Sequence, residues 1–197
     1  MAPAYKRILL KLSGEALMGT LSHGIDPAVA SFIAEEIRQI HSQGVQVAIV
    51  IGGGNFYRGA ESRLAAVDRV TGDTIGMLAT IINSLALAEY LKASSVPCRV
   101  YAAAEMPTVA PLFVRNRAVE DLERGSVVII GGGTGNPFFT TDTAAALRCA
   151  EIQAQVLFKA TKVDGVYDCD PAKNPGAQKL LSVSHAEAIA RNLRIMD

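Results

Sequence analysis

Residues 127–142 combine the residue types from which phosphate-binding turns are built. The segment is Val-Val-Ile-Ile-Gly-Gly-Gly-Thr-Gly-Asn-Pro-Phe-Phe-Thr-Thr-Asp, and its β-branched start predicts a short buried strand. Its four glycines let the backbone approach a ligand closely, and its threonines and asparagine add neutral donors and acceptors. Because a helix-like segment follows at 143–148, backbone N–H groups can converge on an anion there. The segment therefore predicts a phosphate-ligand site in preference to a plain turn.

Two further predicted strands end in glycine-containing turns. One ends in Lys11-Leu12-Ser13-Gly14, and the other is followed by the turn Gly-Gly-Gly-Asn at 52–55. In open α/β sheets, ligands bind beyond the carboxyl ends of the strands, so three such turns predict a crevice for two phosphate-bearing ligands. No turn matches the Walker pattern Gly-x4-Gly-Lys-Ser/Thr or a clean Gly-x-Gly-x-x-Gly after a strand. The chain is therefore neither a P-loop kinase nor an evident dinucleotide binder.

Four charged residues could contribute to such a site. Lys11 could snorkel at a strand end, but the Ser-Gly turn that follows favours a phosphate-binding role. Arg58 could clamp a phosphate bidentately or be a surface residue. Asp73 could cap a helix or accept hydrogen bonds from ribose hydroxyls. Asp142 has the same two alternatives, and near phosphates its carboxylate would have to orient a lysine or hold a metal.

The elements that must position these residues alternate along the chain. Apolar runs predict strands over 7–12, 45–51, 98–103, 127–130 and 155–160. Helical spacing and capping signals predict helices over 27–43, 74–93, 116–124, 143–148 and 184–193. The alternation predicts an α/β protein with a mainly parallel central sheet sandwiched between helices. A chain of 197 residues predicts one domain, 1–197.

The helix predicted over 74–93, which begins after Gly72-Asp73, is apolar on nearly all faces. Such a helix is expected to be buried on all sides, so we expect it to pack against a second subunit in a homodimer. Asn83, Ser84 and Glu89 argue against a membrane span.

Composition excludes other classes of function. Lys+Arg and Asp+Glu number 19 each, the aromatic content is 6%, and there is no Trp, which argues against nucleic-acid binding. Cys98, Cys149 and Cys169 are widely spaced and predict reduced thiols. The first residues run into a strand without a signal-peptide core. We expect a cytoplasmic protein with no membrane partner.

Five segments, 5–17, 51–55, 72–80, 133–142 and 159–167, resemble the bacterial UMP kinases, enzymes of the amino-acid kinase fold. The match runs in order from residue 5 to 197, and the block Thr-Gly-Asn-Pro-Phe-Phe-Thr-Thr-Asp is specific to these enzymes within the fold. The resemblance implies reversible transfer of the ATP γ-phosphoryl group to UMP, giving UDP and ADP in pyrimidine nucleotide biosynthesis. It implies Mg²⁺ as the companion of ATP, held mainly by nucleotide phosphates and by no protein metal site.

The resemblance also assigns roles to residues. The catalytic set is Lys11, Arg58 and Asp142, with Asp142 organising the catalytic lysine. The ATP set is Lys11, Leu12, Ser13, Gly14, Gly54, Arg58, Thr161, Tyr167 and Asp170, the last three at the nucleoside end. The UMP set is Gly53, Asp73, Thr134, Gly135, Asn136, Pro137, Phe138, Phe139, Thr140 and Thr141. Within it Asp73 would bind the ribose, Thr134 and Asn136 the uracil side, and Thr141 the phosphate.

Assembly and regulation are implied in the same way. The family is a homohexamer built from dimers, with GTP as an activator and UTP as an inhibitor, and loop 19–24 matches a segment tied to GTP in some members. Family members continue beyond the equivalent of residue 197. We therefore expect this chain to lack the C-terminal strands and helix of the fold.

Two alternatives compete with this interpretation. The first is another enzyme of the same fold that acts on a carboxylate or carbamate, which the block at 136–142 argues against. The second is a catalytically weak nucleotide-binding regulatory protein, which would keep Lys11 and the glycine turns.

Overall fold

The structure, a computed structural model, describes residues 3–57, 67–161, 163–193 and 195. The chain forms two compact units, Met1–Ala160 and Thr161–Asp197, and each is described by itself. The assignment of the whole chain to one domain stays a prediction.

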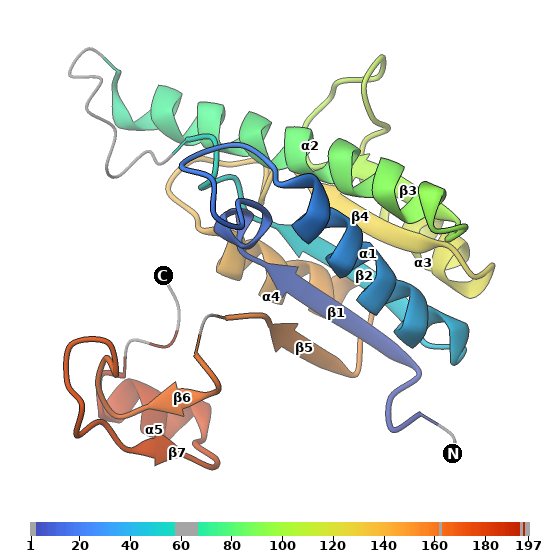
Figure 1. Cartoon of the computed structure of the whole chain (residues 1–197). Helices are drawn as coiled ribbons and strands as arrows, with labels where there is room; N and C mark the ends of the chain where they lie inside the picture. The colour runs from blue at the N-terminus through green and yellow to red at the C-terminus, as the bar shows by residue number, and fades with distance from the viewer. Residues whose placement is uncertain (1–2, 58–66, 162, 194, 196–197) are drawn as a thin grey trace. The chain divides into compact units, whose positions relative to one another are not determined.

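The first unit is built on a five-stranded parallel sheet (Figure 1). Its strands are β1 (Arg7–Leu12), β2 (Gln46–Ile51), β3 (Cys98–Ala102), β4 (Val127–Gly131) and β5 (Val156–Lys159). Their spatial order is β3-β4-β2-β1-β5, and every pairing is parallel. In this register Lys11 lies beside Val50 on one side and beside Lys159 on the other. The predicted α/β class is confirmed.

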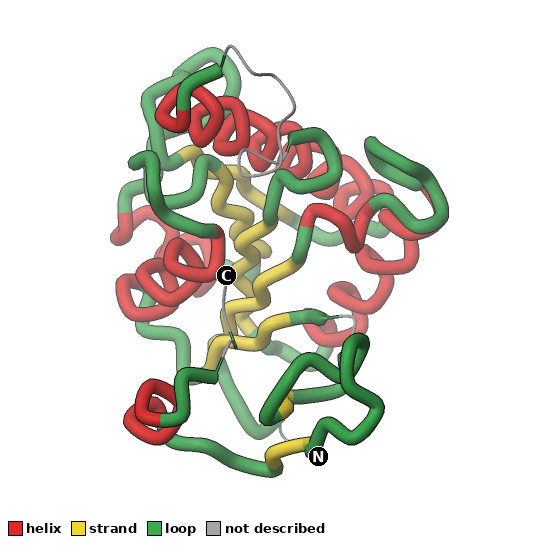
Figure 2. The backbone as a smooth tube through the Cα atoms, turned by 90° about the vertical axis from the view of Figure 1, so that its left-hand side faces the viewer, coloured by secondary structure: helices red, strands yellow, loops and turns green. Residues whose placement is uncertain are grey.

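Helices cover both faces of this sheet (Figure 2). Helices α1 (Pro27–Ser42) and α2 (Arg69–Ala93) pack on one face, and α3 (Arg115–Glu123) and α4 (Thr141–Glu151) on the other. A 3-10 turn, η1 (Gly14–Leu17), follows β1. Because side chains alternate along a strand, Ile8 and Leu12 enter the core under α1 and α2, whereas Leu9 enters the opposite core. The central strands β2 and β4 are buried on both faces, which explains their continuous apolar runs.

Helix α2 begins earlier than the sequence predicts. Its N-cap is Asp68, whose carboxylate accepts hydrogen bonds from the N–H groups of Val70 (2.9 Å) and Thr71 (3.1 Å). The alternative in which Asp73 caps this helix is therefore wrong, because Asp73 lies one turn inside it. From the sequence only Asp73 was considered as a cap, whereas Asp68, an equally suitable residue type five positions upstream, caps the helix.

The outer side of α2 remains apolar. Residues such as Leu87 and Leu91 are fully buried against the sheet, but Leu78 and Ile82 are 48% and 49% exposed. A single chain therefore buries only one side of this helix, and the expectation that a second subunit covers the other side stays a prediction. By length and composition alone α2 could cross a membrane, but its buried face packs in the core as a soluble protein's helix does.

The second unit is small. Strands β6 (Val166–Tyr167) and β7 (Lys179–Leu180) form an antiparallel pair, and helix α5 (His185–Ala190) follows. The Ser184 hydroxyl accepts a hydrogen bond from the Glu187 N–H (3.1 Å) and caps α5, as the sequence predicts. The two short strands were not predicted, because two residues are too few to show a periodic pattern.

Candidate active site

The turns after β1 and β2 touch each other at the carboxyl edge of the sheet. The Gly52 N–H donates to the Leu12 carbonyl (2.9 Å). A Cβ atom at Gly14 would lie 2.6 Å from the Gly52 carbonyl oxygen and 2.8 Å from the Gly54 nitrogen. Only glycine allows this approach at position 14. The expectation that these two glycine turns share one edge is confirmed.

The turn after β4 needs its glycines for a different reason. Gly132, Gly133 and Gly135 have φ angles of 84°, 60° and 82°, a left-handed conformation that favours glycine. The Gly132 N–H donates to the Thr80 hydroxyl (2.6 Å), so helix α2 holds this turn. The turn leads to Thr140, whose hydroxyl accepts a hydrogen bond from the Thr143 N–H (3.3 Å) and caps α4. The predicted sequence of strand, glycine turn and helix N-terminus is thus confirmed.

One buried carboxylate joins two lysines at this edge. Asp142, in the first turn of α4, is 2% exposed. Its Oδ1 lies 2.7 Å from the Nζ of Lys11, and its Oδ2 lies 2.7 Å from the Nζ of Lys159. The Lys11 side chain is 6% exposed and that of Lys159 28% exposed. Since buried charges require partners, the carboxylate can keep two cations side by side, as a polyanion such as a nucleoside triphosphate would require.

Lys159 is a functional candidate that sequence reasoning did not select. It lies in segment 159–167, which resembles the bacterial UMP kinases, but it is in none of the predicted catalytic, ATP or UMP sets. A signal was present, because Lys159 and Lys11 are each the last residue but one of a predicted strand, and the carboxyl ends of parallel strands share one edge. What the sequence did not contain was the adjacency of β1 and β5, which sets the two lysines beside each other.

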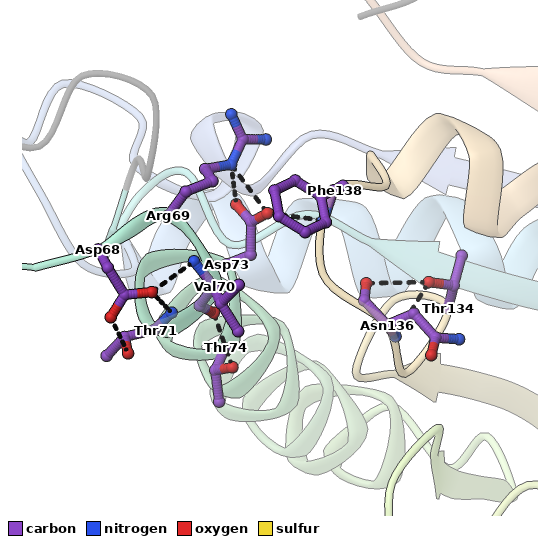
Figure 3. A network of polar contacts seen from close by, with 9 residues as sticks. All are labelled: Asp68, Arg69, Val70, Thr71, Asp73, Thr74, Thr134, Asn136 and Phe138. Carbon is purple, nitrogen blue, oxygen red and sulfur yellow. Dashed lines mark hydrogen bonds and ion pairs between the residues drawn. The ribbon is translucent and has the colours of Figure 1, made fainter.

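A second carboxylate ties α2 to the loop after β4 (Figure 3). The Nε of Arg69 donates to both oxygens of Asp73 (2.8 Å each), and the Phe138 N–H donates to Asp73 Oδ2 (2.7 Å). Burial alone would raise the pKa of Asp73, but these hydrogen bonds outweigh it and hold the pKa below its ordinary value. Asp73 is therefore an ionised acceptor at neutral pH.

Phe138 adopts a conformation that is unusual for a residue other than glycine. Its φ angle is 71°, its ring lies under the Arg69 guanidinium at 5.9 Å, and its side chain is 64% exposed. Strained backbone of this kind persists where the surroundings over-determine it, and here the hydrogen bond to Asp73 does so. The loop is closed further by Thr134, whose hydroxyl accepts a hydrogen bond from the Asn136 N–H (3.2 Å) (Figure 3).

These elements surround one pocket at the carboxyl edge of the sheet. It is lined by Gly53, Gly54, Tyr57, Gly72, Asp73, Gly76, Met77, Thr80, Gly133, Thr134, Asn136, Phe139 and Thr141. Six of the ten residues of the predicted UMP set are among them. The other four, Gly135, Pro137, Phe138 and Thr140, belong to the same loop but do not line the pocket. The remaining lining residues outside the predicted ATP and UMP sets are Tyr57, Gly72, Gly76, Met77, Thr80 and Gly133, of which Gly133 belongs to the predicted glycine turn.

The residues of the predicted ATP set belong to different parts of the chain. Lys11 to Gly14 and Gly54 lie at the contacting turns after β1 and β2. Arg58, expected to clamp a phosphate, lies outside the described residues. Thr161, Tyr167 and Asp170 belong to the second unit, where the Tyr167 hydroxyl donates to Asp164 (2.6 Å) and Asp170 Oδ1 accepts from the Ala172 N–H (3.0 Å). Their ATP-binding role stays a prediction.

Two buried amide side chains connect α2 to the turn after β2. Asn55 and Asn83, 2% and 0% exposed, form a reciprocal pair, with the Nδ2 of each donating to the Oδ1 of the other (2.9 and 2.6 Å). Asn83 Nδ2 also donates to the Gly52 carbonyl (2.7 Å), and Asn55 Nδ2 to the Gly24 carbonyl (2.9 Å). Since buried amides must be paired, this network fixes α2 to the turn after β2 and to loop 19–24.

Within the described part of the chain, no three His, Cys, Asp or Glu side chains converge on a point where they could hold a metal ion. The buried carboxylate at the sheet edge, Asp142, faces two lysines.

Comparison with known proteins gives consistent matches. The sequence model of the amino acid kinase family matches residues 6–194. The solved UMP kinase from Bacillus anthracis is 38% identical, with a TM-score of 0.94 over 99% of this chain and 81% of that one. The UMP kinase from Ureaplasma parvum is 37% identical, with a TM-score of 0.92 over 99% of this chain and 83% of that one. The uridylate kinase from Archaeoglobus fulgidus is 29% identical, with a TM-score of 0.70 over 93% and 76%.

The bridging carboxylate makes a prediction about stability. We expect Asp142→Asn to lower the free energy of unfolding by roughly 3–5 kcal/mol, because it leaves the buried Lys11 ammonium without its counter-charge. Urea denaturation followed by circular dichroism measures the change. Glu35→Gln, which breaks an exposed ion pair with Arg38 on α1, is the control and should leave the midpoint nearly unchanged. An unaltered midpoint for Asp142→Asn would mean that the two lysines do not depend on the carboxylate.

Proposed function

The chain belongs to the amino acid kinase family, and from this premise we propose that it is a UMP kinase, which transfers the γ-phosphoryl group of ATP to UMP and yields ADP and UDP. The observation that carries the proposal is the pair of lysines bridged by Asp142 at the sheet edge where the glycine turns form a pocket. The likeness to two bacterial UMP kinases over nearly the whole chain supports the same substrates. A carboxylate acceptor is not favoured by these matches.

The chemistry that such a reaction needs is supplied by position and charge. The phosphate of UMP has a second pKa of about 6, so at neutral pH it is mostly a dianion and already a nucleophile. No general base is therefore required. The difficulty lies in bringing two polyanions together and in stabilising charge on the group in transfer. Lys11 and Lys159 lower this electrostatic barrier, and Asp142 holds both ammonium groups in place.

ATP enters as its magnesium complex, in which the ion neutralises phosphate charge. We assign the ATP phosphates to Lys11, Leu12, Ser13 and Gly14, assisted by Gly54 and Arg58, and the nucleoside end to Thr161, Tyr167 and Asp170. Lys11 and Arg58 would be the catalytic cations, and Asp142 would hold the Lys11 ammonium group in position. The contact between the turns after β1 and β2 supports a common phosphate site for the first group.

We assign UMP to the pocket that contains Gly53, Asp73 and the lining residues of loop 134–141. Asp73 is suited to the ribose because it is ionised and because a carboxylate has about four acceptor positions, of which Arg69 and Phe138 use a part. Thr134 and Asn136 would face the uracil side, and Thr141, in the first turn of α4, the phosphate. The loop residues Gly135, Pro137, Phe138, Phe139 and Thr140 complete this set.

We also propose a homodimer formed through the exposed apolar side of α2, with dimers assembling into a hexamer in the cytoplasm. Leu78, Ile82 and Leu85 lie on that side at 48%, 49% and 37% exposure, which is costly to leave in water along one helix. GTP activation and UTP inhibition remain part of the proposal, together with the pyrimidine pathway. Loop 19–24 would connect an effector to the pocket, since Gly24 exchanges two hydrogen bonds with Asn55 in the turn after β2.

The function is tested by an ADP-release assay with Mg-ATP and a panel of acceptors. We expect turnover with UMP and little with CMP, AMP or aspartate, because the chain as a whole is similar to two bacterial UMP kinases. Turnover with aspartate alone would replace the proposal by the carboxylate-kinase alternative. Binding of UMP without ADP release would favour a nucleotide-binding regulatory protein.

Lys11→Ala tests the role of the buried lysine. We expect kcat to fall by roughly 10²-fold or more, since a preorganised cation acts on charge that develops in the transition state. The KM for UMP should change only a few-fold. Steady-state kinetics with Lys92→Ala, which removes a surface lysine of α2, provides the control. A near-normal kcat for Lys11→Ala would exclude it from the chemistry.

Ile82→Asp tests the proposed dimer. Two aspartates brought together at an apolar interface would repel each other and lose solvation, so we expect the variant to be monomeric at micromolar concentration. Light scattering coupled to gel filtration gives the mass. Leu147→Asp, at a site on α4 with similar exposure (43%), should keep the wild-type mass. A monomeric wild-type protein would contradict this proposal.

A further inference from the structure

Tyr57 lies where the turn after β2 meets the pocket. Its N–H donates to the Gly53 carbonyl (3.1 Å), so its backbone is fixed to the same glycine turn that contacts Gly14. The side chain is half-buried and lines the pocket together with Gly53, Asp73 and Gly76. Tyr57 is therefore held at the pocket by its backbone, independently of any contact made by its hydroxyl.

The hydroxyl of Tyr57 is buried and, in the part of the chain that the structure describes, has no hydrogen-bond partner. The buried Tyr101, by contrast, has a partner for its hydroxyl, which donates to Asp121 (2.7 Å). A buried hydroxyl without a partner costs stability, whereas phenylalanine would fill the same space without that cost. Because Tyr57 lines the pocket, a ligand bound there is the candidate for the missing partner.

The surroundings of Tyr57 leave room for such a ligand. Gly72 and Gly76 are four residues apart on α2 and both line the pocket without a side chain. A Cβ atom at Gly76 would meet nothing within 4 Å. Between these glycines in sequence stands Asp73, whose carboxylate can only accept hydrogen bonds. Tyr57 adds a donor to a wall that already has an acceptor, which suits an oxygen-bearing group such as a ribose or a phosphate.

We propose that the Tyr57 hydroxyl donates a hydrogen bond to a ribose or phosphate oxygen of the nucleoside monophosphate in this pocket, and so contributes to selection of the acceptor. This inference rests on the proposed function. A phenylalanine at position 57 could not make this contact with the ligand.

Calorimetric titration with UMP tests the contact. We expect Tyr57→Phe to raise the Kd for UMP about five- to tenfold, the effect of one lost hydrogen bond, while the ligand-free variant melts at the wild-type temperature or higher. Tyr101→Phe is the matched control, since it removes a buried hydroxyl that has its partner. It should lower the melting temperature and leave the Kd for UMP unchanged.

Uridine and 2′,3′-dideoxyuridine monophosphate identify the acceptor oxygen. The analogue that lacks it should bind wild type and Tyr57→Phe equally well. A Kd for UMP that is the same in wild type and Tyr57→Phe would overturn the inference while leaving the proposed function intact. A difference that persists undiminished with both analogues would also overturn it. If wild type itself does not bind UMP, the proposed function fails and the inference fails with it.

Discussion

The buried carboxylate of Asp142 is the constraint on which the site depends. Two ammonium groups on neighbouring strands repel each other, and one of them is almost fully withdrawn from water. The fold can hold them only because α4 begins at the same edge and delivers a counter-charge from its first turn. The glycine turn between β4 and α4 must therefore serve two purposes, since it forms pocket wall and also sets the point at which the helix starts.

Helix α2 connects most of the remaining features. Along one side it supplies Asp73 to the loop after β4, Thr80 to the turn at Gly132, and Asn83 to the turn after β2. Along the other it exposes Leu78 and Ile82. The buried side of α2 combines these polar contacts with core residues such as Leu87 and Leu91, so one helix links the geometry of the pocket to whatever covers its apolar outer side. Assembly and catalysis would then share one structural element.

Local patterns predicted the features that depend on local chemistry. The five strands of the sheet, the glycine turn after β4, and Lys11 at the end of β1 follow from residue type and spacing alone. The partnership of Lys11 with Lys159 could not be derived in this way, because it depends on which strands are neighbours. The start of α2 was misplaced because Asp68 and Asp73 both resemble caps, and only the folded chain shows that Asp73 instead bonds the Phe138 N–H. Tyr57 was not selected, since an unpaired hydroxyl is a property of packing.

The pairing of Lys11 with Lys159 has a consequence for folding. Side chains alternate between the faces of a sheet, so a slip of β5 by one residue against β1 would turn every side chain of β5 to the opposite face. Lys159 would then leave Asp142, and a lysine would face the apolar core on the other side. Strand β5 is only four residues long and lies at the edge of the sheet, where hydrophobic contacts specify register least. The same three charges that suit the site for phosphate thus also discriminate between alternative strand alignments, so that the chain reaches its lowest free energy only when its reactive groups are assembled.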